Sequence, residues 1–287
     1  MMWCHACSTA FDTRECPHCG WGPRDVNGLR CFAMENARAG HGYDPAYYAD
    51  LARLETRHFW FRARNRLIVH AMRKYFPRAR SFLEIGCGTG VVLQAVHAAM
   101  PGLAASGSEL FVEGIHFARE RLPGLTLMQM DATRIPFADE YDVIGAFDVL
   151  EHVDEDLRVL GEIHRALHPG GGVLLTVPQH PWLWSHQDEL AHHVRRYRRG
   201  ELEEKLRRTG FDILHSTSFV TLLLPLLLMS RRVIQRKGDD PFHELRIGGL
   251  ANVTLGAILK FEFQSLRMGL RLPIGGSRLI VAAKRAS

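Results

Sequence analysis

A strand that breaks directly into a glycine-rich turn is the feature that most restricts how this chain can fold. Residues Ser81–Ile85 are mostly apolar and predict a buried strand. Three glycines follow within Gly86–Gly90, and a helical stretch begins at Val91. Glycine permits a sharp turn and lets a ligand approach the backbone, because no Cβ stands in the way. The sequence therefore predicts a strand–turn–helix unit with a ligand-binding turn.

The spacing of these glycines differs from the G-x-G-x-x-G fingerprint of dinucleotide-binding proteins. Counted from Gly86, the third glycine of that fingerprint would fall at Val91, whereas the chain has Gly90. This early glycine argues against a nicotinamide dinucleotide and favours a smaller adenosyl ligand without a pyrophosphate.

Strand-like and helical stretches alternate over residues 79–219, which is typical of a parallel sheet with helices on both faces. The predicted strands are Ser81–Ile85, Ala104–Glu109, Leu125–Met130, Tyr141–Phe147, Gly172–Val177, Asp212–Phe219 and, much later, Ser277–Lys284. The predicted helices are Val91–Met100, Phe111–Arg121, Glu155–Leu167 and Gly200–Thr209. We expect an α/β, Rossmann-like, doubly wound sheet of seven strands over residues 79–287, preceded by a helical segment at 41–78.

Acidic side chains end three of the predicted strands. Glu109 follows Gly90 by 109 − 90 = 19 residues, where a carboxylate can accept both hydroxyls of a ribose. Asp131, next to Ala132, is placed to face an adenine amine or simply to cap a helix. Asp148 ends the fourth strand. Open α/β sheets bind ligands at the carboxyl ends of their strands, so we expect these carboxylates around one pocket.

Several linked segments carry a family resemblance, and they cover residues 79–219 plus the last strand. Leu83–Gly90, Ser108–Glu109, Met130–Ala132, Phe147–Val153 and Leu167–Gly171 resemble, in order and spacing, the motifs of class I S-adenosylmethionine-dependent methyltransferases. The likeness is closest to the type 11/12-like, small-molecule branch, which includes quinone-biosynthesis enzymes.

The resemblance implies S-adenosylmethionine as the cofactor. It places Glu84 at the amino end of the methionine moiety, Glu109 on the ribose, and Asp131 with Ala132 on the adenine. The implied cofactor-binding residues are Glu84, Gly86, Cys87, Gly88, Gly90, Glu109, Asp131, Ala132 and Asp148.

A stretch rich in His, Trp, Tyr and Arg at residues 178–197 follows the fifth strand and predicts an acceptor site. A hydroxyl acceptor needs a base, and the candidate catalytic residues are His152, His186 and His193. Arg195 or Arg196 would meet an anionic acceptor. A metal site from His186, Asp188 and His192 or His193 is a minor alternative, since nothing in the sequence fixes its geometry. The fourth strand lacks the Asn/Asp-Pro-Pro-aromatic motif of exocyclic-base methyltransferases, which disfavours that reaction.

Two Cys-x-x-Cys pairs occupy the first 24 residues. Cys4, Cys7, Cys16 and Cys19 predict a tetrahedral site for structural Zn²⁺ in a small zinc-ribbon-like knuckle, residues 1–24. A redox pair is the alternative, but both pairs lie outside any strand–helix unit.

An apolar insertion at residues 220–276 separates the last two predicted strands. Its first run, Phe219–Met229, is followed by Arg231, Arg232, Arg236 and Lys237, and a second helical stretch covers Leu250–Leu272. The first run is shorter than the ~20 apolar residues that span a bilayer. It predicts either a helix in the headgroup region or a cover for the active site or a dimer contact.

Composition leaves the acceptor undecided. The chain of 287 residues has 36 basic and 31 acidic residues, a modest excess that identifies no partner. The N-terminus has no secretory pattern, so we expect a cytoplasmic enzyme, peripheral at the inner membrane surface if residues 219–272 meet lipid. Our main hypothesis is methyl transfer to a small-molecule or lipid-linked acceptor at oxygen. An RNA methyltransferase using the knuckle to bind nucleic acid and a non-catalytic adenosyl-binding regulator are the alternatives.

Overall fold

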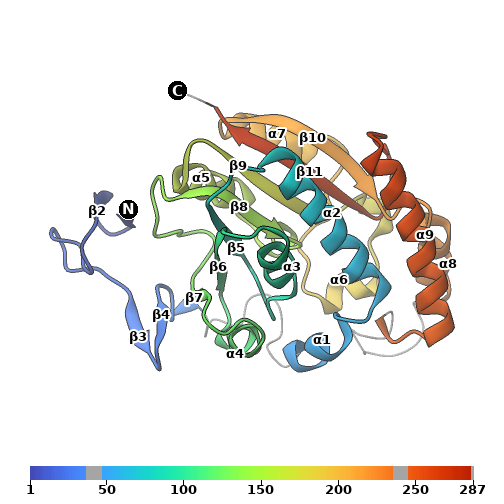
Figure 1. Ribbon diagram of the computed structural model, residues 1–287, viewed down its shortest axis with the longest axis horizontal. Helices are drawn as coiled ribbons and strands as arrows, with labels where there is room; N and C mark the ends of the chain where they lie inside the picture. Colours follow the sequence, from blue (N-terminus) through green and yellow to red (C-terminus); the bar gives the residue numbers. More distant parts are fainter. Residues whose placement is uncertain (37–46, 235–244, 286–287) are drawn as a thin grey trace.

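A computed structural model describes residues 1–36, 47–234 and 245–285 (Figure 1). Residues 41–46 of the predicted helical segment, as well as Arg236 and Lys237 of the apolar insertion, lie outside the described residues.

The described residues form one mixed sheet of nine strands in the order β10-β11-β9-β8-β5-β6-β7-β4-β3 (Figure 1). Its centre is parallel and holds β5 (Ser81–Ile85), β6 (Ala104–Glu109), β7 (Thr126–Gln129), β8 (Tyr141–Phe147) and β9 (Leu167–Pro178). At one edge, β11 (Ser277–Lys284) runs antiparallel between β9 and β10 (Phe211–Phe219). The parallel order places the carboxyl ends of β5, β6 and β8 side by side, which positions the site described below.

Two strands that we did not predict extend the other edge of the sheet. β3 (Arg24–Val26) and β4 (Leu29–Cys31) form a hairpin, and β4 pairs in parallel with β7. The turn between them is Asn27-Gly28, with φ of 53° and 71°. Asn-Gly with two positive φ values is the favoured turn of a two-residue hairpin. The expected seven strands are therefore present, but the sheet has nine.

Helices cover both faces of the sheet. They are α1 (Tyr48–Leu54), α2 (Phe59–Tyr75), α3 (Val91–Ala99), α4 (Val112–Arg121), α5 (Asp156–Ala166), α6 (His186–Leu190), α7 (Glu201–Arg208), α8 (Leu224–Ile234) and α9 (Gly249–Arg267). Side chains alternate along each strand, so Phe82 joins the core under α2 and α3 while Leu83 joins the core under α5 and α7. These two apolar cores hold the helices to the sheet.

A small unit at the N-terminus packs against the loop after β7. β1 (Met2–Cys4) and β2 (Thr9–Phe11) form a hairpin with its own core of Cys4, Phe11 and Cys16. The backbone N–H of Trp3 donates to Pro136 O (3.0 Å), and that of Ala138 donates to Met1 O (3.1 Å). The unit is therefore attached to the sheet domain by main-chain bonds.

Helices α8 and α9 follow β10 and precede β11 in the sequence, and α9 runs along α2 (Figure 1). Several of their large apolar side chains are exposed, among them Met229, Leu250, Val253, Phe261 and Met268. None of the helices in the described residues is long and apolar enough to cross a membrane.

Candidate cofactor and acceptor site

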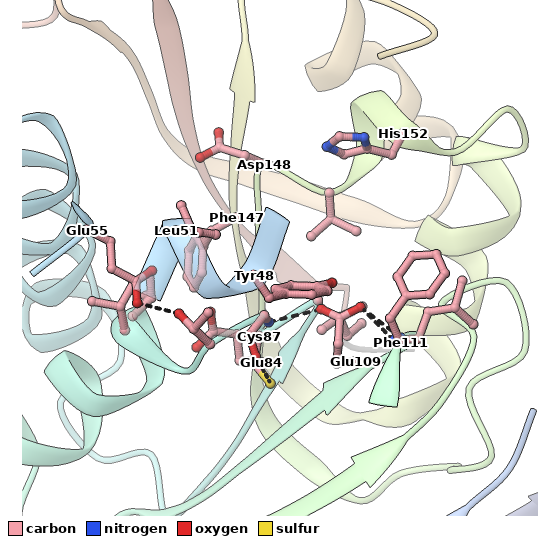
Figure 2. A pocket seen from close by; sticks show the side chains of 18 of the residues that line it. Tyr48, Leu51, Glu55, Glu84, Cys87, Glu109, Phe111, Phe147, Asp148 and His152 are labelled. Carbon is pink, nitrogen blue, oxygen red and sulfur yellow. Dashed lines mark hydrogen bonds between the residues drawn. The ribbon is translucent and has the colours of Figure 1, made fainter. Parts of the chain in front are cut away.

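A pocket of about 400 Å³ lies at the carboxyl ends of β5, β6 and β8, beneath α1 and α2. Figure 2 shows Glu84, Cys87 and Glu109 at one end of it, and Asp148 and His152 at the other. The pocket is lined by every residue of the predicted cofactor site except Gly90, namely Glu84, Gly86, Cys87, Gly88, Glu109, Asp131, Ala132 and Asp148. The structure thus brings together residues as far apart in the sequence as Glu84 and Asp148, which are separated by 148 − 84 = 64 positions.

The turn after β5 depends on glycine. Gly86 has a φ of +65°, and a Cβ there would lie 2.5 Å from Cγ2 of Val149, in the segment after β8. Gly90 has a φ of +81° and precedes the first residue of α3. Gly90 is not among the residues that line the pocket, because its Cα faces Leu122 and Ala118 instead. Cys87 is buried within the turn, where burial raises the pKa of its thiol.

Glu84 is a buried carboxylate whose Oε2 has no hydrogen-bond partner among the described residues. Burial raises its pKa well above the usual value of 4.5, and the guanidinium of Arg64 opposes this only in part. A buried carboxylate without partners is costly, and a bound ammonium group would remove that cost. The amino group of a methionine moiety fits this position.

Glu109 is held by the backbone of two neighbouring segments. The N–H of Gly88 donates to its Oε2 (2.9 Å), and the N–H groups of Leu110 and Phe111 donate to its Oε1 (2.7 and 3.3 Å). Burial nevertheless raises its pKa. A carboxylate oxygen has further lone-pair positions, so Glu109 can still accept hydrogen bonds from the hydroxyls of a ribose.

Asp131 stabilises the turn that follows β7 and also lines the pocket. Its Oδ1 accepts hydrogen bonds from the backbone N–H and the hydroxyl of Thr133, both at 2.8 Å. Its Oδ2 accepts from the side-chain amide of Asn36, in the N-terminal segment. No helix begins at Asp131, so it caps a turn and not the helix that one of the two interpretations of the sequence expected, and its place in the pocket is compatible with the other.

Asp148 is fixed at the end of β8 by a partly buried ion pair with Arg64 of α2. The hydroxyl of Thr176, on the neighbouring strand β9, also donates to Asp148 (3.1 Å). The φ of Asp148 is +57°, an uncommon value for a residue other than glycine. The pairing with Arg64 ties the helix above the pocket to the strand beneath it.

Two of the three candidate histidines reach the pocket. His152 and His193 line it, and their rings meet edge to face with centroids 4.8 Å apart. Burial, and next the neighbouring His193, lower the pKa of His152 to about 3. His186 does not line the pocket, because it is in the first turn of α6 and pairs with Glu189 on the surface (3.1 Å).

The arginines expected to meet an anionic acceptor are engaged elsewhere. Arg195 pairs with Asp156 (2.7 Å), and the buried Arg196 pairs with Asp188 (2.7 Å). Neither lines the pocket. Although burial opposes it, hydrogen bonds and charges from His193 and Arg196 hold the pKa of Asp188 well below its ordinary value.

The four N-terminal cysteines gather into one cluster. The Sγ atoms of Cys4 and Cys19 are 3.4 Å apart, as are those of Cys7 and Cys16, and no disulfide links them. Sulfurs around a zinc ion at ~2.3 Å are separated by about 3.8 Å. The donor set and its spacing therefore fit a tetrahedral Zn²⁺ site.

Part of the pocket comes from residues that we did not predict. Tyr48, Glu55, Trp60, Phe61 and Arg64 line it from α1 and α2, as well as from the residue that follows α1. Glu55 accepts hydrogen bonds from Thr89 of the glycine-rich turn and from Arg121 of α4. The helical pattern of 41–78 predicts a helical segment, but it does not say that these helices cover the ends of the strands.

Comparison with known proteins agrees with this geometry. The methyltransferase domain family matches residues 54–216 of the chain. A Mycolicibacterium smegmatis protein named "Probable S-adenosylmethionine-dependent methyltransferase" is 26% identical over 163 residues, which cover 56% of this chain and 62% of the relative. A phthiotriol/phenolphthiotriol dimycocerosates methyltransferase of Mycobacterium ulcerans is 33% identical over 97 residues, 33% of this chain and 36% of the relative. The chain thus matches less than two thirds of the length of these relatives.

Solved structures show the same fold. A chain from the complex between the Haloferax volcanii Trm112 methyltransferase activator and a methyltransferase aligns with a TM-score of 0.54 at 18% identity. The alignment covers 84% of this chain and 97% of that chain. With the family match over more than half of its length, this chain belongs to the methyltransferase domain family.

Proposed function

We propose that this chain transfers a methyl group from S-adenosylmethionine to a hydroxyl of a small-molecule or lipid-linked acceptor. The observation that carries the proposal is the buried carboxylate of Glu84 beside the glycine-rich turn, whose Oε2 has no hydrogen-bond partner in the part of the chain that the structure describes. S-adenosylmethionine brings an ammonium group and an adenosine, and the pocket offers a chemical partner for each of these two parts.

The cofactor would lie along the carboxyl ends of the strands. Glu84 would bind the ammonium group, Glu109 the ribose, and Asp131 with Ala132 the adenine. The backbone of Gly86, Cys87 and Gly88 would contact the ligand closely, and Gly90 would allow the turn that places them. Asp148, which pairs with Arg64, would complete the wall between the cofactor and the acceptor.

The methyl group would then point toward His152 and His193. In the reaction the acceptor hydroxyl would pass its proton to His152 or His193, its oxygen would form a bond to the methyl carbon, and the electrons of the broken S–CH₃ bond would remain on sulfur. The sulfonium is already reactive, so the protein has mainly to align the acceptor and help its proton leave. Both histidines line the pocket and can contact a hydroxyl there.

Apolar surroundings support an acceptor with an apolar part. Trp60, Phe61 and Val153 are among the residues that line the pocket. Exposed apolar side chains of α8 and α9, such as Leu250 (83% exposed) and Phe261 (69%), provide a surface for contact with lipid. Arg231, which we expected to flank that surface, points inward to Asp188 and Leu183 O. The lipid-related name of the M. ulcerans relative favours the same acceptor class.

The proposal includes a division of the chain into a knuckle at 1–24, a helical segment at 41–78 and a methyltransferase domain at 79–287. The knuckle would bind structural Zn²⁺, since four thiolates leave no open position for chemistry. The enzyme would be cytoplasmic, with residues 219–272 at the inner membrane surface.

Transfer of a labelled methyl group tests the acceptor. The purified chain is incubated with methyl-labelled S-adenosylmethionine and, in parallel, with lipid, RNA and small-metabolite extracts. We expect label in the lipid or metabolite fraction, in a product that resists alkaline hydrolysis as an ether does. Label that ribonuclease releases from RNA would support the RNA alternative, and the absence of transfer to any fraction would favour a non-catalytic binding protein.

A further inference from the structure

A second group of metal-binding side chains lies at the acceptor end of the pocket. Among the described residues, two groups of His, Cys, Asp and Glu could hold an ion, and one of them is the cysteine knuckle. The other consists of Glu151, His152 and His193, whose ligand atoms lie within 4.8 Å of one another. We propose that these three side chains bind a divalent transition-metal ion beside the methyl-transfer site.

Glu151 has the features of a carboxylate that lacks its cation. It is 1% exposed, and its Oε2 has no hydrogen-bond partner among the described residues. It lies in the 3₁₀ turn Leu150–His152 at the end of β8, directly before His152. Burying a carboxylate without a partner costs free energy, and a bound cation would remove that cost.

His193 is oriented by a second carboxylate, as metal-binding histidines usually are. Its Nδ1 donates to Asp188 Oδ1 (2.9 Å), which leaves Nε2 as the ligand atom. Asp188 is itself fixed, because it accepts from Arg196 Nε (2.7 Å) and from the backbone N–H of Ser185 (2.9 Å). A carboxylate on the far nitrogen of a ligating histidine holds the ring in place and makes it a better ligand.

The backbone holds the two segments of the cluster together. The N–H of Val194 donates to Glu151 O (2.7 Å), so the residue after His193 is bonded to the turn that holds Glu151 and His152. The edge-to-face contact between His152 and His193 keeps the two rings next to each other. His152 and His193, which are 193 − 152 = 41 positions apart in the sequence, are therefore held in one cluster before any ligand binds.

The donor set indicates the class of ion. Ligand atoms around one ion at ~2.1 Å are separated by about 3–4 Å, so a small inward movement of the side chains would complete the site. Two imidazoles and one carboxylate suit manganese, iron, cobalt or zinc better than calcium or magnesium. Three protein ligands also leave open coordination positions, unlike the four thiolates of the knuckle.

Because His152 and His193 line the pocket, an ion bound by them would be within reach of an acceptor hydroxyl there, and this step rests on the proposed function. A cation there lowers the pKa of a hydroxyl that it contacts. The hydroxyl proton would pass to water, the oxygen would form the O–CH₃ bond, and the S–CH₃ electrons would remain on sulfur. His152 and His193 would then serve as metal ligands and not as bases, because the ion would make the hydroxyl acidic enough to lose its proton to water.

Binding of Mn²⁺ tests the site directly. The probe is Mn²⁺ because carboxylate and imidazole ligands hold it well, whereas the thiolates of the knuckle favour Zn²⁺. The full chain, with its knuckle loaded with zinc, is titrated with Mn²⁺, and the free ion is followed by electron paramagnetic resonance. We expect one Mn²⁺ per chain, with the Kd raised at least tenfold by Glu151→Gln and by His193→Gln.

The matched control is His116→Gln, which changes an exposed histidine paired with Glu120 on α4 and should leave the Kd unchanged. Glu151→Gln keeps the shape of the side chain, so it carries the test if the histidine variant fails to fold. Absence of Mn²⁺ binding, or equal losses in the control, would overturn the proposal. Calorimetry with S-adenosylmethionine is run in parallel. If the unchanged chain binds Mn²⁺ but not S-adenosylmethionine, the proposed function is wrong and the metal site is still supported.

Discussion

Replacing Glu84 with glutamine should have opposite effects on stability and on cofactor binding. The change keeps the shape of the side chain but removes a buried charge whose Oε2 has no partner among the described residues. In the ligand-free chain this removes a penalty of about 1–3 kcal/mol, and the Tm should rise by about 2 °C or more. With S-adenosylmethionine the same change removes a charged hydrogen bond of about 1.5–3 kcal/mol, which corresponds to a Kd raised roughly 10- to 150-fold.

The effect on stability should also depend on pH. Burial raises the pKa of Glu84 in the folded chain above 4.5, so the folded state binds its proton more tightly than the unfolded state does. The ligand-free protein therefore loses stability as the pH rises from about 4.5 to the folded pKa. The difference in unfolding free energy between Glu84→Gln and the unchanged chain should be small near pH 4.5 and should grow above it.

Glu262 provides a matched control, since it is also a buried glutamate with a raised pKa. Unlike Glu84 it accepts three backbone hydrogen bonds, from Val220 (2.6 Å), Thr221 (2.8 Å) and Leu222 (2.8 Å). Glu262→Gln should lower the Tm, because the amide has only one oxygen to accept these bonds, and it should leave the Kd unchanged. Thermal unfolding and calorimetry measure both quantities. An unaltered Kd in Glu84→Gln would refute our placement of the methionine ammonium group.

Three further predictions concern the glycine-rich turn, the knuckle and the apolar helices. Gly86→Ala should abolish measurable cofactor binding in calorimetry, because its Cβ would lie 2.5 Å from Val149, whereas Gly102→Ala, with a similar φ of +83° and no atom within 4 Å, should bind normally. Cys16→Ser should lower the zinc content by one ion per chain in metal analysis of anaerobically purified protein, and should lower the Tm and weaken cofactor binding severalfold. In flotation with anionic vesicles the chain should rise with the lipid, and Phe261→Ser together with Leu250→Ser should reduce the bound fraction at least twofold. If the double variant and the unchanged chain bind the vesicles equally, α9 does not contact the lipid.

The sequence predicts the centre of the fold well because its signals there are local. Ser81–Ile85 and Tyr141–Phe147 are apolar runs between turn residues, and the structure gives them the same bounds. β9 begins at Leu167, earlier than the predicted Gly172, because Leu167 pairs with Tyr141 before an irregularity in the ladder. The β3–β4 hairpin was missed although Asn27-Gly28 is a strong turn signal, since three-residue strands have too little apolar pattern to be recognised.

The pocket is predictable only where the topology determines it. Glu84, Glu109 and Asp148 occupy the ends of neighbouring parallel strands, so their meeting follows from the order of the strands. Tyr48 and Arg64 reach the pocket through the docking of α1 and α2, and no local pattern encodes that. The choice between His186 and His193 depends in the same way on a short helix, whose direction the sequence leaves open.

The N-terminal segment contacts residues beside the cofactor pocket, and for this reason a change in the knuckle should affect cofactor binding. The side chain of Gln129, the last residue of β7, accepts from Ala33 N and donates to Ala33 O, both at 2.9 Å. Gln129 is fully buried, so loss of the N-terminal segment would leave its amide without these partners. Two residues further on, Asp131 accepts from Asn36. The residue that we place at the adenine is therefore positioned from both sides, by its own turn and by the segment that follows the knuckle.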